Sequence, residues 1–174
     1  AEDGAQPLKD PQAALRRARE RRAAVEAGLA ELEQWLADQT RAGLATIDRG
    51  AYARFDHMAA RLVDAQCPAV ASWVRSLAGV VATGEDRHAR LLEELAGLYL
   101  LVRAHARIDE LDDALAATVR SRIGYPVAKE SVLATAPVRD RWTVAAQRDT
   151  DRDRVRERRW WLVGEASGRV AVVL

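Results

Sequence analysis

The sequence has a single cysteine, Cys67, among its 174 residues. One thiol cannot form a disulfide within the chain, and it cannot build a cysteine-rich zinc site on its own. A dominant charge is also lacking, because Lys and Arg together number 27 and Asp and Glu together number 26. The resulting net charge of +1 predicts no general attraction to nucleic acid or to a membrane surface.

Long apolar runs are missing as well. No stretch approaches the ~20 residues that a membrane span needs, and nothing at the beginning of the sequence resembles a signal peptide. We therefore expect a cytoplasmic protein that makes no contact with membranes. What the sequence does have is a globular composition, with 49% apolar and 30% charged residues. A chain of this length can bury a core of its own, and its length predicts one domain, or one and a half.

Helical periodicity extends over most of the chain, because apolar residues recur every three to four positions from Pro11 onward. We expect five helices, over residues 11–41, 51–65, 69–81, from Thr83 past Val102, and from near Asp109 to Ile123. The residues expected on inner faces are Tyr52, Phe55, Ala59, Leu62 and Val63 in the second helix, Val70, Trp73, Val74, Leu77 and Val81 in the third, and Leu111, Leu115, Val119 and Ile123 in the fifth.

The fourth of these helices is apolar on almost all sides, with Leu92 and Tyr99 beside Leu95 and Leu98. This pattern predicts that it is the central helix, with Leu95 and Leu98 buried. In the first helix, Arg22 interrupts the apolar stripe. Either the early part of that helix is poorly buried, or the stem of Arg22 covers apolar surface.

After Pro137 the apolar period changes from 3.6 to 2, which indicates strands. We expect strands over residues 142–147, 158–163 and 170–174, joined by a charged turn over 147–154 and a glycine-bounded hairpin loop over 164–168. In the first strand, Trp142, Val144 and Ala146 should share one face. The last strand has no turn after it, which predicts that the sheet continues beyond the end of this sequence.

These patterns predict an α+β fold that is mainly α, with a bundle of about five helices followed by an antiparallel β-meander of about three strands. The expected domains are a linker or tail over residues 1–10, a helical domain over 11–136 and the meander over 137–174.

Catalytic and metal-binding constellations are not found in the sequence. Cys67 has no histidine near it in the sequence to act as a base, so we expect a plain buried or half-buried cysteine and not a nucleophile. Glu85 and His88 form one Glu-x-x-His pair, whereas a carboxylate-bridged metal pair needs two. The acidic run from Asp149 resembles the start of a calcium loop, but Arg154 occupies the position that needs glycine and the final acid is also missing. We therefore expect no catalytic residue, no cofactor and no metal in this chain.

Arginines next to tryptophans form the candidate interaction surface. Its members are Arg154, Arg156, Arg158, Arg159, Trp160 and Trp161. Arginine beside aromatic rings suits phosphate contact combined with base stacking. Acidic residues interleave with these arginines and offset their charge, which is typical of a solvated face or a protein contact. Consecutive residues of a strand point to opposite faces, so one tryptophan should be in the core and the other partly exposed.

Three stretches of the sequence resemble one family. Residues 56–68 (DHMAARLVDAQCP) resemble its helical middle, and residues 137–142 (PVRDRW) and 161–169 (WLVGEASGR) resemble the entry to its C-terminal sheet. The family is that of the bacterial, mainly actinobacterial-type SWIM zinc-finger proteins, and the likeness runs from about Leu15 to Leu174.

The resemblance implies a parent protein that binds zinc and whose finger contacts DNA or proteins. It also implies a helical region and a C-terminal sheet with no known catalytic residues. The family's zinc ligands form a Cys-x-Cys and a Cys-x-His motif, and neither motif occurs here. No zinc ligand is therefore assigned to any position of this sequence.

We accordingly expect a non-catalytic interaction or scaffold region of a SWIM-type protein, with a protein partner. The alternative is a nucleic-acid-binding module that uses the arginine- and tryptophan-rich sheet. Nucleic acid is also a candidate partner through the parent's finger. An enzyme is the third class, because no nucleophile, base or metal set can be assembled from the sequence.

Overall fold

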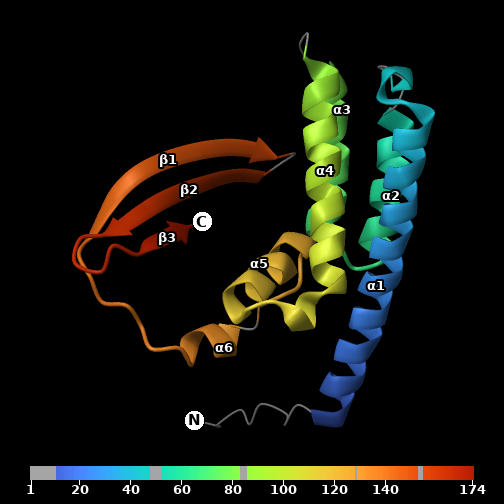
Figure 1. Ribbon diagram of the computed structural model, residues 1–174. Coiled ribbons are helices and arrows are strands. Elements are labelled where there is room, and N and C mark those ends of the chain that lie inside the picture. The colour runs from blue at the N-terminus through green and yellow to red at the C-terminus, as the bar shows by residue number, and fades with distance from the viewer. Residues whose placement is uncertain (1–10, 48–51, 83–85, 128, 153–154) are drawn as a thin grey trace. The chain divides into compact units, whose positions relative to one another are not determined.

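The computed structural model describes residues 11–47, 52–82, 86–127, 129–152 and 155–174 (Figure 1). The chain divides into two compact units, Ala1–Val127 and Ala128–Leu174. The first unit is a helical bundle, and the second contains a short helix and a three-stranded antiparallel sheet. The α+β, mainly α fold expected from the sequence is confirmed.

The helical unit contains α1 (Pro11–Ala42), the short 3-10 helix η1 (Leu44–Thr46), α2 (Tyr52–Asp64), α3 (Pro68–Ala82), α4 (Arg87–Ala106), the 3-10 helix η3 (Ile108–Glu110) and α5 (Asp113–Ile123). Local chemistry sets the bounds of α5. Asp112 caps its beginning by accepting a 2.9 Å hydrogen bond from the backbone N–H of Leu115. Gly124 ends it in the left-handed region with φ 104°, a conformation that glycine adopts without strain. Thr83, the expected start of the fourth helix, lies outside the described residues.

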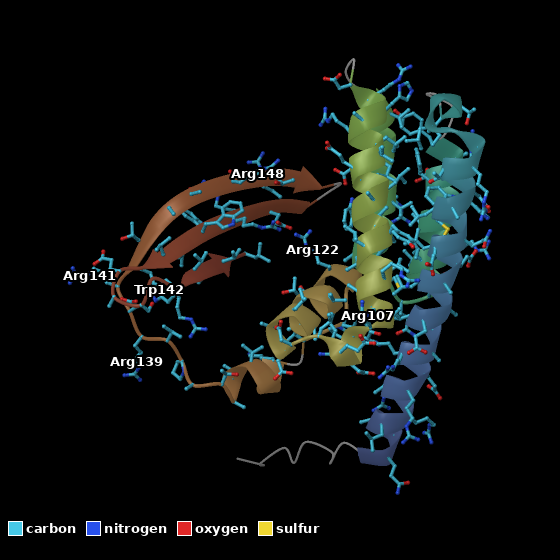
Figure 2. All side chains as sticks on the ribbon, viewed as in Figure 1. Arg107, Arg122, Arg139, Arg141, Trp142 and Arg148 are labelled. Carbon is cyan, nitrogen blue, oxygen red and sulfur yellow. The ribbon has the colours of Figure 1, made fainter. Side chains whose placement is uncertain are left out.

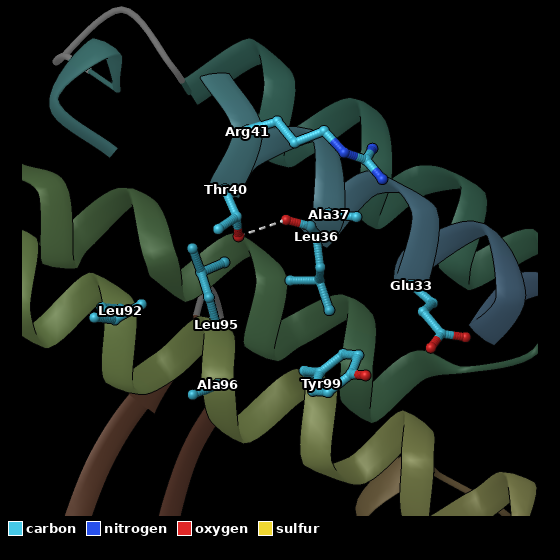
Figure 3. A pocket seen from close by; sticks show the side chains of 9 residues that line it. All are labelled: Glu33, Leu36, Ala37, Thr40, Arg41, Leu92, Leu95, Ala96 and Tyr99. Carbon is cyan, nitrogen blue, oxygen red and sulfur yellow. Dashed lines mark hydrogen bonds between the residues drawn. The ribbon is translucent and has the colours of Figure 1, made fainter. Parts of the chain in front are cut away.

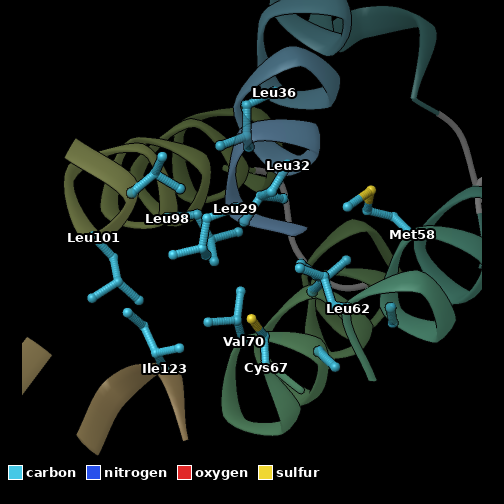
Figure 4. Packing of buried hydrophobic residues seen from close by; sticks show 14 of the residues in the cluster. Leu29, Leu32, Leu36, Met58, Leu62, Cys67, Val70, Leu98, Leu101 and Ile123 are labelled. Carbon is cyan, nitrogen blue, oxygen red and sulfur yellow. The ribbon is translucent and has the colours of Figure 1, made fainter. Parts of the chain in front are cut away.

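Helix α4 is at the centre of the bundle, because it contacts α1, α3 and α5. Leu95 and Leu98 are 4% and 0% exposed, which confirms their expected place in the core. Figure 4 shows Leu98 among the buried residues of the helical unit. Not every side of α4 is covered, however, since Leu92 and Tyr99 are both well exposed. Every residue of the buried hydrophobic cluster belongs to the helical unit. Within the described residues, no helix combines the length and the apolar character that a membrane crossing requires.

The first turns of α1 are poorly buried. This is the first of the two explanations given for the position of Arg22 on the apolar stripe. Leu15 is 61% exposed, and the first α1 residue in the core is Val25. Three other residues expected inside are also exposed, namely Tyr52, Val63 and Leu115. Val63 follows the buried Leu62 directly, so it is rotated by about 100° from the inner face of α2.

The second unit contains α6 (Lys129–Leu133), which was not expected, and three strands. These are β1 (Trp142–Arg152), β2 (Val155–Gly164) and β3 (Val170–Val173), in the order β1-β2-β3. The charged turn expected over residues 147–154 is wrong for residues 147–152, because β1 continues to Arg152 and these residues pair with β2. Residues 153 and 154 lie outside the described part of the chain. Cross-strand pairs of opposite charge, such as Asp149 with Arg158, stabilise this polar stretch as a strand.

A β-bulge also changes which residues of β1 share a face. Val144 pairs with Leu162, whereas Ala146 pairs with the adjacent residue of β2, Trp161. The extra residue in β1 reverses the alternation from that point onward. The expected common face of Trp142, Val144 and Ala146 is therefore wrong, because Ala146 lies on the opposite face from Val144.

Candidate functional site

A pocket of about 520 Å³ lies between α1 and α4 (Figure 3). Leu36 from α1 and Leu95 from α4 form its floor, and each is only 4% exposed. Leu92 and Tyr99 on α4 also line it and remain 52% and 44% exposed. Ala96 lies between them, so α4 presents an apolar stripe at positions i, i+4 and i+7. We call this feature the α1–α4 groove.

The charged side chains at the groove have partners within the chain. Arg41 on α1 is 2.8 Å from Asp38, one turn before it. Glu33 on α1 is 3.4 Å from Arg103 on α4, so this pair joins the two helices. The Thr40 hydroxyl donates a 3.0 Å hydrogen bond to the backbone carbonyl of Leu36. The groove therefore has an apolar floor and a rim whose charges are compensated, which suits an apolar occupant.

Cys67 lies in the core and is 0% exposed. Burial raises the pKa of its thiol to about 11, so the reactive thiolate is scarce at neutral pH. The nearby turn after α2 packs closely on α1: a Cβ at Gly28 would overlap the Cβ of Ala65. The cysteine therefore acts as a small buried apolar residue, as the sequence indicated.

One polar cluster lies among the helices. His105 on α4 is 7% exposed, and its Nε2 is 3.2 Å from the hydroxyl of Tyr125. Burial lowers the pKa of His105 and raises the pKa of Tyr125. Arg22 on α1 is 2.8 Å from Glu26 and reaches Asp109 at 3.3 Å. The cluster offers hydrogen bonds and ion pairs between elements.

Metal ligands do not gather in the described part of the chain, where no group of three His, Cys, Asp or Glu side chains could hold a metal ion. Glu85 lies outside the described residues, and His88 is half-buried on α4. Asp149, at the start of the calcium-like run, instead pairs with Arg158. Cys67 is buried, and among the described residues it does not belong to a group of three side chains that could hold zinc.

The sheet separates the predicted arginine and tryptophan cluster into two faces. Successive residues of β2 point to opposite sides, so Arg158 and Trp160 share one face and Arg159 and Trp161 share the other. Each guanidinium lies near the tryptophan of its own face, at 6.0 Å and 5.9 Å from the ring centre respectively. Both tryptophans are half-buried, so the expected division into one core and one exposed ring is wrong.

Arg154 and Arg156 were also predicted to belong to this cluster. Arg154 lies outside the described residues. Arg156 is paired in register with Asp151, on the face of Arg158 and Trp160. Five of the six predicted residues therefore lie on the described part of β2, and four of them form two arginine–tryptophan pairs on opposite faces, not one surface.

Asp140, which the sequence analysis missed, fastens the hairpin loop between β2 and β3. Its carboxylate accepts hydrogen bonds from the Ser167 hydroxyl at 2.6 Å, from the Ser167 N–H at 2.8 Å and from the Ala166 N–H at 3.2 Å. These bonds, the Ser167 hydroxyl above all, lower the pKa of Asp140 to about 2. The expected loop over 164–168 is confirmed, and Asp140 is a structural acceptor within it.

A family model matches residues 20–123, from the third turn of α1 to the end of α5. That model describes the SWIM-associated four-helix bundle domain. The chain belongs to this SWIM family. The matched region contains all of the described residues that line the α1–α4 groove. Comparison with curated proteins and with solved structures gives no significant match.

Proposed function

We propose that this chain is a non-catalytic interaction region of a SWIM-type protein, and that the α1–α4 groove receives an amphipathic helix of a protein partner. The observation that carries the proposal is the exposed stripe of Leu92, Ala96 and Tyr99 over an apolar floor. A partner helix with apolar residues at i, i+3, i+4 and i+7 is the usual complement of such a groove.

The charges around the groove favour an apolar occupant over a charged one. Arg41 and Glu33 already form ion pairs with Asp38 and Arg103. A charged ligand would have to compete with these pairs, whereas an apolar helix face would cover the stripe and leave them in place. A small apolar molecule is the competing occupant, because the volume lies within the range of about 300–1,000 Å³ that such ligands use.

The resemblance to SWIM zinc-finger proteins supports a further proposal about the parent protein. We infer a cytoplasmic, bacterial parent protein in which a zinc finger binds the metal and contacts DNA or proteins. Its zinc is not assigned to residues of this chain, since the described residues lack a suitable ligand group and Cys67 is buried as a neutral thiol. The helical unit would then add a second, protein-binding surface.

The test is a titration of the isotope-labelled full chain with a synthetic amphipathic helix that has leucines on one face and uncharged flanks. We expect NMR signals of the groove residues to shift. Leu92→Asp should weaken binding at least about tenfold, the effect of losing about 1.4 kcal/mol. Leu100→Asp is the matched control, because Leu100 is another exposed leucine of α4 that does not line the groove.

Equal affinity of the two variants would contradict the proposal. The proposal would also be contradicted if a peptide of the same composition in scrambled order binds as tightly as the amphipathic helix. If a small apolar probe shifts the groove signals and the helix does not, the groove is a small-molecule site and the proposed partner is wrong.

A further inference from the structure

The face of the sheet that carries Arg159 and Trp161 has a different charge balance from the opposite face. On the opposite face, Arg158 forms two hydrogen bonds with Asp149, at 2.8 Å and 2.9 Å. Such a bidentate pair satisfies both the charge and the planar geometry of the guanidinium. Arg158 is therefore already occupied by an acid of its own chain.

Arg148 and Arg159 lie directly opposite each other on β1 and β2. Like charges at paired positions of an antiparallel sheet repel each other. Glu157 is the nearby acid of this face, and it is 2.5 Å from a terminal nitrogen of Arg159. Glu157 pairs with Arg159 and leaves the charge of Arg148 without an acidic partner among the described residues, so this part of the face is positively charged.

Hydrogen-bond donors also remain open on this face. The side chain of Arg148 is exposed, and no hydrogen bond or ion pair joins it to another side chain among the described residues (Figure 2). The Nε of Arg159 is buried and has no hydrogen-bond partner among the described residues. A ligand cannot reach this buried atom, but the Arg159 side chain as a whole is 40% exposed and Arg148 is exposed. The accessible guanidinium nitrogens of both arginines are well suited to phosphate oxygens, which accept in a forked geometry.

An aromatic ring lies next to these donors. Trp161 is two residues after Arg159 on β2, half-buried, with its ring centre 5.9 Å from the Arg159 guanidinium carbon. Its partner on β1 is Ala146, an exposed residue whose small side chain covers little of the neighbouring ring. A partly exposed aromatic ring on a sheet face, with arginines beside it, is the arrangement on which single-stranded bases stack.

We propose that the face formed by Arg148, Arg159 and Trp161 binds single-stranded nucleic acid, with the two arginines on backbone phosphates and Trp161 against a base. This activity is additional to the proposed protein-binding groove and uses none of its residues. The ring distinguishes a nucleic acid from a phosphopeptide, because a peptide phosphate needs the arginines alone.

The test measures fluorescence anisotropy of a labelled oligothymidylate with the full chain over a range of salt concentrations. Two phosphate contacts predict a slope of about −1.4 for log affinity against log salt, or about a 25-fold loss of affinity for a tenfold rise in salt. Arg148→Gln should weaken binding and reduce the slope to about −0.7. Arg148→Lys should keep the slope, because a lysine retains the charge.

Arg139→Gln is the matched control, since it removes the same charge from the same unit outside the sheet (Figure 2). It should leave both affinity and slope nearly unchanged. Trp161→Leu should weaken binding without changing the slope, because stacking is not an ionic contact. Circular dichroism of each variant shows whether the sheet has folded.

The proposal is overturned if the oligonucleotide fails to bind even at low salt, or if Arg148→Gln and Arg139→Gln behave alike. It is also overturned if a phosphopeptide competes as well as an unlabelled oligonucleotide, which would make the face a general phosphate site. None of these outcomes affects the groove, so failure here is distinct from failure of the proposed protein contact.

Discussion

His105 is a titratable residue placed in the helical core, with Tyr125 as its hydrogen-bond partner. Burial disfavours its charged form and lowers its pKa below the usual 6.5, and the nearby Arg22 acts in the same direction. Glu26 and Asp109 act in the opposite direction, but burial is the larger effect. The unfolded chain therefore binds a proton at this histidine at higher pH than the folded chain does.

This difference predicts acid sensitivity of the bundle. The stability that neutral His105 contributes is fully present above about pH 6.5 and is lost as the pH falls through the lower folded pKa. Urea unfolding at pH 7 and pH 5 should show a loss of stability that is smaller in His105→Gln. His57→Gln is the control, because His57 is exposed, and it should behave as the unmodified chain. An equal loss in all three proteins would contradict this role of His105.

The chemical character of a single residue was predictable from the sequence where it depends on burial alone. Cys67 was expected to be an inert thiol, and its burial gives it that character. Asp140 was not predictable, because its four hydrogen bonds come partly from a loop that is distant in the sequence. The opposition of Arg148 and Arg159 was also missed, since it depends on a register that a bulge shifts.

At the scale of elements, Gly28 explains how α1 approaches the turn between α2 and α3. A glycine inside a helix ordinarily costs about 1 kcal/mol against alanine. Here the backbone of α1 lies so close to Ala65 that no Cβ has room. The glycine is therefore required by helix packing.

Two alanine substitutions separate packing from helix propensity. Gly28→Ala should destabilise the bundle by about 1–3 kcal/mol, because the added methyl group forces α1 away from Ala65. Gly79→Ala should stabilise it by about 0.5–1 kcal/mol, since Gly79 is exposed on α3 with open space around the added atom. Chemical denaturation measures both changes. A stabilising Gly28→Ala would show that the close approach is absent.

The helices were more predictable than the strands. Each long helix carries its own apolar period, and the structure confirms five of them near the expected positions. The end of β1 was not predictable, because residues from Gln147 onward are polar and the sequence resembles a turn there. What makes them a strand is pairing with the arginines and the glutamate of β2, which is a property of both strands together.

At the scale of the whole molecule, the chain combines a SWIM-family bundle with a sheet unit, and each unit carries one proposed surface. The sequence predicted the α+β order because the period changes after Pro137. It did not predict the groove, because an apolar pattern on α4 cannot show which of its apolar residues neighbouring helices leave uncovered. Leu92 and Tyr99 were expected among the apolar faces of a central helix, and they line the groove instead.

The central claim, that the groove is where a protein partner binds, is tested most directly by site-specific photocrosslinking in cells that naturally express the gene. The photoreactive residue is placed as Ala96→benzoylphenylalanine in the groove and as Leu100→benzoylphenylalanine on the outer side of α4. Mass spectrometry then sequences the attached peptides. We predict that position 96 captures one segment of another protein with apolar residues at helical spacing, and that position 100 does not. The same peptides at both positions, or only small molecules at position 96, would contradict the claim.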